Sequence, residues 1–343
     1  MAQVSRVETR QAVDESLTTP RRIHGRRHVL DLDDFSRDEI EEVLQNTTVM
    51  KEVLQRDIRK VPTLRGKSVV TLFLEPSTRT RLSFEQAGKI LSADVLNVTA
   101  SGSSAEKGES LYNTALTLQA MNADIIVVRH PHAGAPHFLA RHLDSNLINA
   151  GDGSHAHPTQ ALLDLYTIKS HLGRIEGLKV VMVGDILYSR VARSNLWGLT
   201  QMGANVVLCA PPTLMPTDFV NGYRSVEGHP FASIQIEPSV ERALQDADVV
   251  MTLRLQLERQ QAGHLPTLRE YSRMYGITME RLKLAKPEVL VMHPGPMNEG
   301  IEIEPEVAHG SRSVIEEQVT NGVAVRMALL YGLVTPIRGV GPA

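Results

Sequence analysis

The feature that most constrains the fold is an alternation along the chain between short apolar runs rich in β-branched residues and longer segments with helical periodicity. The helical segments carry an apolar stripe, as where Leu111, Ala115 and Leu118 recur at i, i+4 and i+7. The apolar runs predict strands at residues 68–73, 95–98, 125–128, 179–183, 205–209, 249–252 and 289–292. This alternation predicts an α/β fold in which mainly parallel sheets are flanked by helices.

The length and composition of the chain indicate two domains. Its 343 residues are 42% hydrophobic and 22% charged, which is enough to bury the cores of two units of ordinary size. Small and turn-forming residues cluster at 149–154, and we place the boundary just after them, giving domains at 27–155 and 156–312. An apolar helix predicted at about 313–335 could pack on either half. Residues 1–26 are polar, lack an apolar period and are predicted as a mobile extension.

Net charge and cysteine content argue against several classes of partner. The formal charge of -3 gives no global electrostatic reason to expect nucleic acid or an anionic membrane. The chain has no run of about eighteen consecutive apolar residues that could span a bilayer. The single cysteine, Cys209, lies in a predicted buried strand, which is typical of an inert thiol in a reducing compartment. We therefore expect a cytoplasmic protein that contacts neither nucleic acid nor membrane.

A polar string from Ser77 to Arg81 follows a predicted strand and opens a helical stretch. It consists of Ser77, Thr78, Arg79, Thr80 and Arg81. Free N–H groups and the positive end of the helix dipole attract anions at such a place, and the hydroxyl and guanidinium groups add charge-assisted hydrogen bonds. A Ser-Thr pair alone is more often only a helix cap, but the full string favours a site for a phosphate or a carboxylate.

Two further cations follow predicted strands at their carboxyl ends, the edge at which open parallel sheets bind ligands. Arg129 follows the strand at 125–128, and Arg254, with Gln256 nearby, follows the strand at 249–252. The planar fork of arginine pairs bidentately with carboxylates. Taken alone, Arg129 could equally be a solvated surface residue, and a charged loop such as that of Arg254 is more often solvated surface.

Neither a metal nor a nucleotide cofactor is expected. His155 and His157 lie two residues apart, but no cysteine or carboxylate spacing completes a recognisable set of metal ligands. Gly184 follows a predicted strand without the remaining glycines of a dinucleotide-binding loop. We therefore predict no cofactor and interpret His155 as structural.

Taken together and in this order, the motifs between about His28 and Leu333 resemble the aspartate/ornithine carbamoyltransferase family. The resemblance implies two domains with parallel sheets and a C-terminal helix that packs back on the first domain. It implies that carbamoyl phosphate is bound by Ser77, Thr78, Arg79, Thr80, Arg129, His157, Gln160 and the backbone carbonyls of Gly295 and Pro296. Of these, Thr80, Arg129 and His157 would stabilise the developing oxyanion and so act in catalysis. Gln160 would contact the carbamoyl nitrogen.

The aspartate branch of that family implies a second substrate site and an oligomer. Aspartate would be bound by Lys107, Arg190, Arg254 and Gln256, with Ser103 and Lys107 reaching in from an adjacent subunit. The expected assembly is a homotrimer, which could join a regulatory chain or a dihydroorotase. Glu75 would pair across the domains with Arg190 and Arg259 and favour a closed form. The implied reaction forms N-carbamoyl-L-aspartate and phosphate, the committed step of de novo pyrimidine (UMP) biosynthesis.

Two rival functions stay open. A transferase for ornithine or another amine would need an anionic pocket, and for ornithine a cysteine in the motif that here reads His293, Pro294, Gly295, Pro296. A non-catalytic structural or regulatory homologue would be expected to lose some of Arg79, Arg129, His157 and Arg254, all of which are present. One departure is the segment 297–299, where many relatives place an arginine. It bears on domain closure or partner docking more than on the ligand site.

Overall fold

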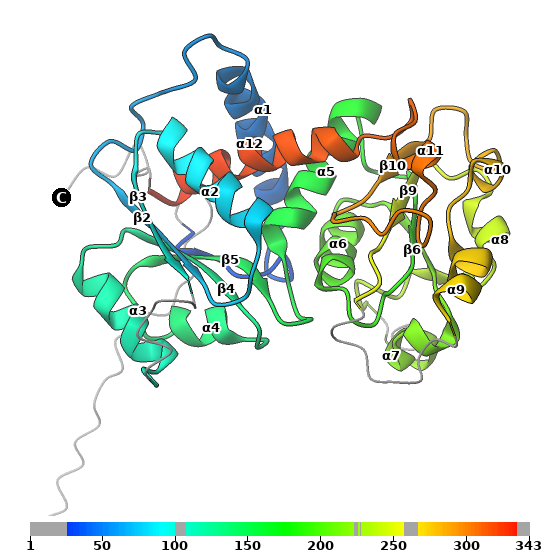
Figure 1. Cartoon of the computed structure of the whole chain (residues 1–343), viewed down its shortest axis with the longest axis horizontal. Coiled ribbons are helices and arrows are strands. Elements are labelled where there is room, and N and C mark those ends of the chain that lie inside the picture. Colours follow the sequence, from blue (N-terminus) through cyan, green and yellow to red (C-terminus); the bar gives the residue numbers. More distant parts are fainter. Residues whose placement is uncertain (1–25, 100–107, 223–225, 227, 257–266, 335–343) are drawn as a thin grey trace, which may run out of the picture.

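The computed structural model describes residues 26–99, 108–222, 226, 228–256 and 267–334. Ser103, Lys107 and Arg259, to which roles in substrate binding or closure are assigned above, lie outside these residues, as does almost all of the predicted N-terminal extension. Figure 1 shows two α/β domains side by side, which confirms the predicted fold class.

The first sheet has five parallel strands, in the order β1-β5-β4-β2-β3. They are β1 (His28–Val29), β2 (Ser68–Phe73), β3 (Asp94–Thr99), β4 (Ile125–His130) and β5 (Asn146–Asp152). The helices of this half are α1 (Arg37–Leu54), α2 (Thr78–Ile90), α3 (Leu111–Ala120) and α4 (Ala135–Ala140). Because all pairs are parallel, the carboxyl ends of these strands meet at one edge, from which the loops of the first domain approach the second.

Alternation along β2 and β4 divides their side chains between two hydrophobic clusters. Val69 and Val127 belong to the larger cluster, whereas Val70 and Val128 belong to a smaller one that includes Ala115 and Leu118 of α3. Successive strand residues point to opposite faces, so helices cover both sides of the sheet. This two-sided burial explains why both strands read as continuous apolar runs.

The second sheet is also parallel and five-stranded, in the order β10-β9-β6-β7-β8. Its strands are β6 (Lys179–Val183), β7 (Asn205–Cys209), β8 (Gln235–Ile236), β9 (Val249–Thr252) and β10 (Leu290–Met292). Its helices are α6 (Arg190–Gln201), α7 (Thr217–Asn221), α8 (Val240–Leu244), α9 (Leu268–Tyr275), α10 (Met279–Leu282) and α11 (Pro305–Ala308). A short 3-10 helix, Pro212–Leu214, follows β7.

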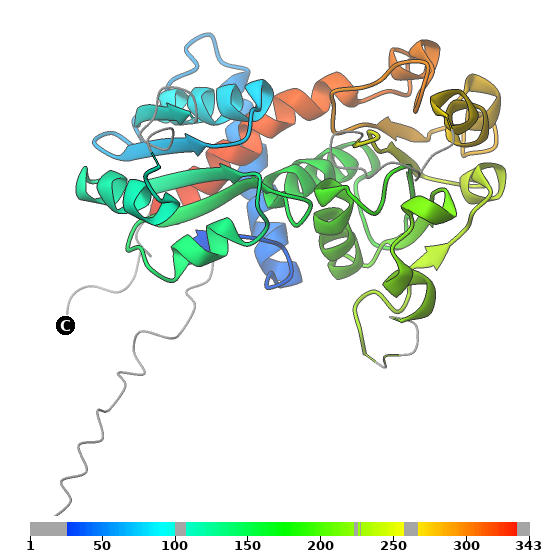
Figure 2. The same ribbon diagram turned by 60° about the horizontal axis from the view of Figure 1, so that its bottom comes forward.

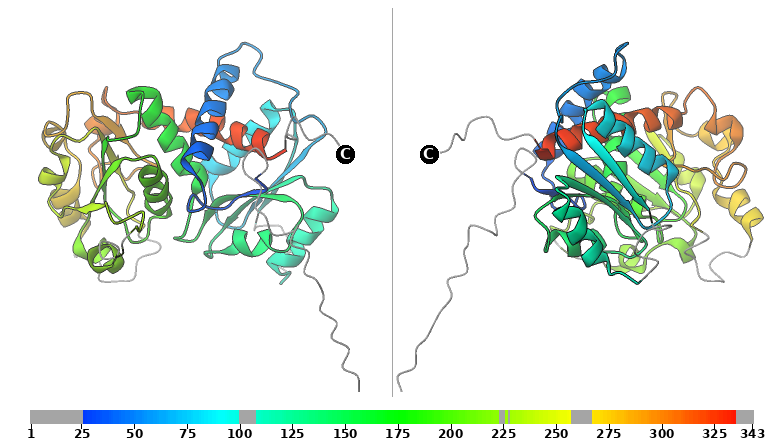
Figure 3. Two further views of the ribbon diagram at one scale, coloured as in Figure 1. Left: turned by 180° about the vertical axis from the view of Figure 1, so that it is seen from behind. Right: turned by 60° about the vertical axis from the view of Figure 1, so that its left-hand side comes forward.

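Two long helices connect the halves: α5 (Pro158–Leu172) and α12 (Ile315–Val334). Figures 2 and 3 show α12 running from the second domain back across the first, where it packs on α1, α2 and α5. The expectation that the C-terminal helix packs on the first domain is therefore confirmed. The boundary that we place after residue 155 falls between β5 and α5 and stays a prediction.

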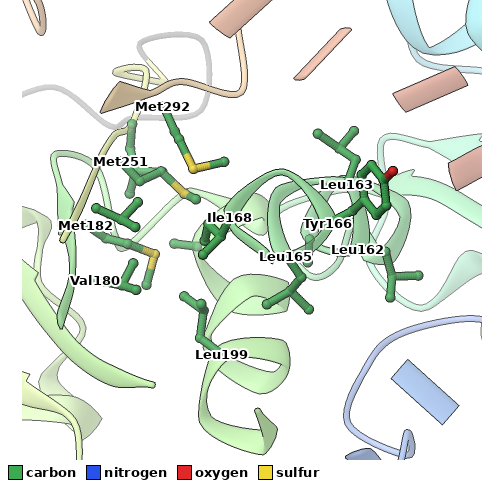
Figure 4. Close-up of a cluster of buried hydrophobic side chains, with 14 of the residues drawn as sticks. Leu162, Leu163, Leu165, Tyr166, Ile168, Val180, Met182, Leu199, Met251 and Met292 are labelled. Carbon is green, nitrogen blue, oxygen red and sulfur yellow. The ribbon is translucent and has the colours of Figure 1, made fainter. Parts of the chain in front are cut away.

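The core is continuous where α5 meets the second sheet. Figure 4 shows Ile168 of α5 directed toward Met182, Val180 and Leu199, with Met251 close by, and all of them are buried. Unbranched methionine side chains fill the irregular space between a helix and a sheet well. Within the part of the chain that the structure describes, none of the helices has the length and hydrophobicity that a bilayer crossing requires.

Candidate active site

A cavity of about 490 Å³ lies between the two domains. It is lined from the first domain by the loop after β2, the start of α2 and Arg129 at the end of β4, and from the second by the start of α6 and the loops after β9 and β10. The start of α5 and one side of α12 complete it. The lining residues include Glu75, Ser77, Thr78, Arg79, Thr80, Arg129, His157, Gln160, Arg190, Arg254, Gln256, Gly295, Pro296 and Arg326. Every predicted ligand residue that the structure describes thus lines this one space.

The charge of the lining is strongly positive. Five arginines contribute to it, namely Arg79, Arg129, Arg190, Arg254 and Arg326, whereas Glu75 is the only acidic lining residue in the described part of the chain. Burial, and after it the nearby charge of Arg254, lowers the pKa of the Arg79 guanidinium. Cations held this close together in partly desolvated surroundings favour binding of an anion.

Ser77 occupies the N-cap position of α2 but does not cap the helix. Its backbone is extended, with φ -162° and ψ 102°, and within the described residues its side chain makes no cap hydrogen bond. By contrast, Ser36 at the start of α1 forms a complete capping box with Glu39. The hydroxyl of Ser77 and the first N–H groups of α2 are therefore left available to a ligand in the cavity.

Gly295 allows the guanidinium of Arg79 to lie against the loop after β10. The φ of Gly295 is +60°, and a β-carbon added there would collide with the guanidinium of Arg79. The loop itself is held by a hydrogen bond from the Gly295 N–H to Nδ1 of His293, 2.8 Å long. Here glycine is needed both for the backbone conformation and for the close approach.

Glu75 joins the two domains. Its Oε1 accepts hydrogen bonds from Nη2 of Arg129 at 2.7 Å and from Nη2 of Arg190 at 2.6 Å, and its Oε2 accepts one from Nη1 of Arg190 at 2.9 Å. The two arginines also donate to backbone carbonyls of the segment after Asn149, Arg129 to Ala150 and Arg190 to Gly153. Both arginines are buried, 8% and 6% exposed, so their positions are fixed before any ligand arrives.

His157 and Gln160 lie at the start of α5. His157 is buried in the N-cap position, and its backbone N–H donates to Oγ of Ser194 at 2.9 Å. Pro158 at the first helical position suits this start because its missing N–H would have no partner there. Gln160 donates from Nε2 to Oδ1 of Asp164, one turn along, at 3.0 Å.

The loop after β9 is held by Asp185 at the end of β6. Its Oδ2 accepts the backbone N–H of Gln256 at 3.0 Å, and its Oδ1 accepts that of Tyr188 at 2.9 Å. The side-chain amide of Gln256 donates to the carbonyl of Arg254 at 3.3 Å. Arg254 and Gln256 are thereby anchored at the edge of the second sheet that faces the first domain.

Sequence reasoning missed a buried polar group that begins in the cavity wall and continues behind it. Asp164, Gln318 and Arg326 come from α5 and α12 and are all buried. Burial raises the pKa of Asp164 to about 7, against the effect of its hydrogen bonds and of Arg326. Burial lowers the pKa of Arg326 to about 10. The signal was present, since a charged residue within an apolar helix is seldom buried without a role.

A separate group of potential metal ligands lies outside the cavity lining. Three residues each offer one potential ligand atom, and these atoms lie within 4.8 Å of one another: His137, Asp152 and His155. The Asp152 carboxylate already accepts hydrogen bonds from the N–H groups of Gly134 and Ala156 and from the Asn149 amide, and Nδ1 of His155 lies 3.1 Å from its Oδ2. These hydrogen bonds account for the arrangement as a brace of the turn before α5.

Comparison with known proteins agrees with this geometry. Residues 27–170 match a family model for the carbamoyl-phosphate-binding domain of aspartate/ornithine carbamoyltransferase, and residues 176–333 match one for its Asp/Orn-binding domain. The chain is 63% identical to a protein of Roseiflexus sp. over 90% of this chain and 95% of the relative, and 62% identical to one of Chloroflexus aurantiacus over 89% and 97%. Both relatives are named aspartate carbamoyltransferase catalytic subunit.

Solved structures give the same result. Aspartate transcarbamoylase from Trypanosoma cruzi, in complex with N-(phosphonacetyl)-L-aspartic acid, superposes with a TM-score of 0.81 at 31% identity, over 90% of this chain and 96% of that one. Ornithine carbamoyltransferase from Pyrococcus furiosus superposes with a TM-score of 0.80 at 29% identity, over 92% and 98%. With both halves matched by its models, and with relatives this similar over nearly their full length, the chain belongs to the aspartate/ornithine carbamoyltransferase family.

Proposed function

We propose that this chain transfers the carbamoyl group of carbamoyl phosphate to the amine of L-aspartate, forming N-carbamoyl-L-aspartate and phosphate. This reaction is the committed step of de novo pyrimidine (UMP) biosynthesis. The observation that carries the proposal is the convergence of five arginines and one glutamate on a single interdomain cavity. Two small anions side by side, a phosphate and a dicarboxylate, are the ligands that such a lining favours.

Carbamoyl phosphate is assigned to the wall formed by the first domain. Its phosphate would accept hydrogen bonds from Ser77, Thr78, Arg79 and Thr80 at the start of α2, where the N-cap hydroxyl is not used by the helix. Arg129 and His157 would donate to the carbonyl oxygen. Gln160 and the carbonyls of Gly295 and Pro296 would accept hydrogen bonds from the NH2 group.

Aspartate is assigned to the wall formed by the second domain. Arg254, Gln256 and Arg190 line that side, and Lys107 would complete the carboxylate site. Lys107 and Ser103 lie outside the described residues, and we propose that both come from an adjacent subunit of a homotrimer. Such a trimer could assemble further with a regulatory chain or a dihydroorotase. We place the enzyme in the cytoplasm, a proposal that the buried, unpaired thiol of Cys209 supports.

The chemistry needs positioning and electrostatic stabilisation more than an added nucleophile. The aspartate amine attacks the carbonyl carbon, forming the N–C bond while the C–O bond to phosphate breaks. The amine proton passes to the departing phosphate, which is basic enough to accept it. Thr80, Arg129 and His157 would hold the oxyanion that forms on the carbonyl oxygen, each worth about 2.7–4 kcal/mol by analogy with oxyanion-hole donors. Fixing both reactants in one cavity lowers the entropic part of the barrier.

Aspartate is favoured over ornithine by the charge of the acceptor side. An ornithine ammonium would need an unoccupied anionic partner. Among the lining residues that the structure describes, the only carboxylate is that of Glu75, and it is already bound to Arg129 and Arg190. The similar superposition on an ornithine enzyme reflects the shared fold and does not decide the acceptor.

Binding of a bisubstrate analogue tests the proposal. A molecule carrying a phosphonate and a dicarboxylate should bind the purified protein by calorimetry with one site per chain, and L-aspartate should be carbamoylated while L-ornithine is not. The variant Arg254→Gln should bind the analogue at least about tenfold more weakly, because one bidentate pair is lost. No binding by the folded wild-type protein, or turnover with ornithine alone, would overturn the assignment.

Mixing inactive variants tests the shared site. Lys107→Gln and Arg79→Ala chains are each expected to be inactive alone. If Lys107 acts in the neighbouring subunit, hybrid trimers will contain some sites with neither substitution and will recover activity. Hybrids that form, as seen by native mass spectrometry, and yet stay inactive would contradict the shared site.

A further inference from the structure

Asp164 lies at the centre of a buried group of side-chain amides, two of which line the cavity. It is 0% exposed and accepts hydrogen bonds from three amide nitrogens that belong to three helices. Gln160 of α5 and Gln318 of α12 donate to its Oδ1 at 3.0 and 2.8 Å, and Asn195 of α6 donates to its Oδ2 at 2.8 Å. All three amides donate to the carboxyl group and none accepts from it, so the arrangement is that of the ionised carboxylate, the form that predominates above its raised pKa of about 7.

This carboxylate determines which end of Gln160 is available to a ligand. The amide of Gln160 has one donor end and one acceptor end, and its nitrogen is held by Asp164. Gln160 also lines the cavity. With its nitrogen turned toward Asp164, the end of the amide that points away from that carboxylate is the carbonyl oxygen, a hydrogen-bond acceptor that Gln160 can offer to a ligand.

A second branch from Asp164 reaches the loop after β10. Gln318 donates to Asp164 through its nitrogen, and its Oε1 accepts the backbone N–H of His293 at 3.0 Å. That hydrogen bond holds the start of the loop containing Gly295 and Pro296, which also line the cavity. One carboxylate thus braces both elements that would present acceptors to the carbamoyl nitrogen.

We propose that Asp164 is a positioning residue that makes this cavity selective for an acyl phosphate bearing an NH2 group. By fixing the amides of Gln160 and Gln318, it leaves acceptors on the side where the transferred group binds. Carbamoyl phosphate can donate two hydrogen bonds there. Acetyl phosphate, which carries a methyl group at the same position, would leave those acceptors unpaired, a large penalty in a desolvated site. This inference rests on the proposed function.

The isosteric substitution Asp164→Asn separates orientation from packing. An asparagine has the same shape but brings an NH2 group of its own, which cannot face three amide nitrogens. At least one amide must rotate: Asn195 if the new NH2 takes the place of Oδ2, or Gln160 and Gln318 if it takes the place of Oδ1. In the second case Gln160 would offer a donor to the NH2 of the substrate. In the first, loss of the negative charge weakens the hydrogen bond that orients Gln160. The methyl group of acetyl phosphate forms no hydrogen bond with either end, so its affinity is insensitive to the rotation.

The experiment compares the KM for carbamoyl phosphate with the inhibition constant of acetyl phosphate. In Asp164→Asn, the KM should rise at least about tenfold while the inhibition constant changes less than about twofold. Gln318→Met keeps Asp164 but removes one donor to it together with the branch to His293, and it should show the same pattern to a smaller extent. It is the deciding variant if Asp164→Asn does not fold. Asp144→Asn, at a carboxylate 96% exposed, is the matched control and should change neither constant.

Two results would overturn the inference. Parallel rises in both constants would mean that Asp164 only supports the packing of the cavity, and no change in either would mean that it does not orient Gln160. The wild-type assay separates these outcomes from failure of the proposed function. If the wild-type protein does not transfer the carbamoyl group, the proposed function is wrong. If the wild type is active but the substitution changes both constants equally or neither of them, only the proposed role of Asp164 is wrong.

Discussion

Glu75 and Arg190 are joined across the two domains by two hydrogen bonds, Nη1 to Oε2 at 2.9 Å and Nη2 to Oε1 at 2.6 Å. This bidentate pair uses the terminal nitrogens of the same guanidinium that is assigned to an aspartate carboxylate. Both ligands cannot hold those two nitrogens in the same way at once. Substrate binding must therefore either use the remaining edge of Arg190 or loosen its pairing with Glu75, and the domain contact and the acceptor site become linked.

Neutralising Glu75 should weaken catalysis with aspartate. In Glu75→Gln, Arg129 and Arg190 lose their shared carboxylate while staying largely buried, and breaking such a pair costs about 3–5 kcal/mol where burial is complete. Because Glu75 retains some exposure, we expect a smaller effect, a fall in kcat/KM for aspartate of roughly 10–100-fold. Steady-state kinetics with each substrate varied in turn measures it. Glu176→Gln, at an exposed ion pair with Arg37, is the control. If kcat/KM for aspartate changed equally in the two variants, the domain contact of Glu75 would not be linked to the acceptor site.

Gly295→Ala should weaken carbamoyl phosphate binding without unfolding the protein. A methyl group there would displace the guanidinium of Arg79, so the KM for carbamoyl phosphate should rise at least about tenfold. Gly300→Ala is a matched control, because Gly300 also has a positive φ, +81°, and no described atom lies within 4 Å of an added β-carbon. Both variants should lose about 1 kcal/mol of stability in urea unfolding. If the KM for carbamoyl phosphate rose equally in both variants, backbone strain alone would be responsible for the rise.

Most of the strands that the sequence predicts are buried on both faces, whereas β3, predicted at 95–98, is largely exposed. β2, β4, β6, β7 and β9 read as continuous apolar runs because helices cover both sides of each sheet. The sequence does not predict β5, part of which coincides with the predicted break between domains at 149–154. Its Gly151 lies where a β-carbon would be 3.0 Å from the guanidiniums of Arg129 and Arg190. Its small residues reflect contacts with distant cations, which no local pattern reveals.

The residues of the candidate site also fall into those that a local sequence pattern reveals and those that it does not. Arg129 and Arg254 could be found from the sequence because each follows an apolar strand, and strand ends in parallel sheets share one edge. Asp164 and Gln318 could not be paired, because they are separated by 154 positions and meet only through the packing of α5 on α12. Helical periodicity shows which face of a helix is buried. The periodicity does not show which polar group of another helix that buried face contacts.

Removing the imidazole of His157 should lower the rate with little effect on folding. His157→Ala loses one donor to the developing oxyanion, which corresponds to a fall in kcat of about 10²–10³-fold. His155→Ala is the neighbouring control: His155 braces the turn through Asp152 outside the cavity, so kcat should change less than about threefold. If kcat/KM of the His157 variant equalled that of the wild type, the assignment of His157 would be wrong.

Cys209 should be unreactive in the native protein. It is fully buried in β7, and burial raises the pKa of its thiol to about 12, so almost no thiolate exists at neutral pH. Ellman's reagent should titrate no thiol in the folded chain and one per chain in guanidinium chloride. Rapid labelling without denaturant would show that the second domain opens locally far more often than a packed strand allows.

His28 should make the stability of the first domain depend on pH. Its Nδ1 accepts the backbone N–H of Leu147 at 3.1 Å, where β1 pairs with β5. Burial, and after it the charge of Arg27, lowers the pKa of His28 to about 4. Because the folded pKa lies below the unfolded value of 6.5, the imidazole contributes stability that is present above pH 6.5. That contribution is lost progressively as the pH falls from 6.5 to about 4.

The substitution His28→Asn isolates this effect, since its Oδ1 can accept the same hydrogen bond and does not titrate. Urea unfolding from pH 8 to 4 should give parallel curves above pH 6.5. Below it, the wild type should lose on the order of 1–2 kcal/mol more than the variant, a figure reduced for the partial exposure of His28. Groups that titrate in both proteins, including His130, His137 and His293, cancel in the difference. Curves that stay parallel down to pH 4 would mean that folding does not lower the pKa of His28, so that the pairing of β1 with β5 does not depend on this imidazole staying neutral.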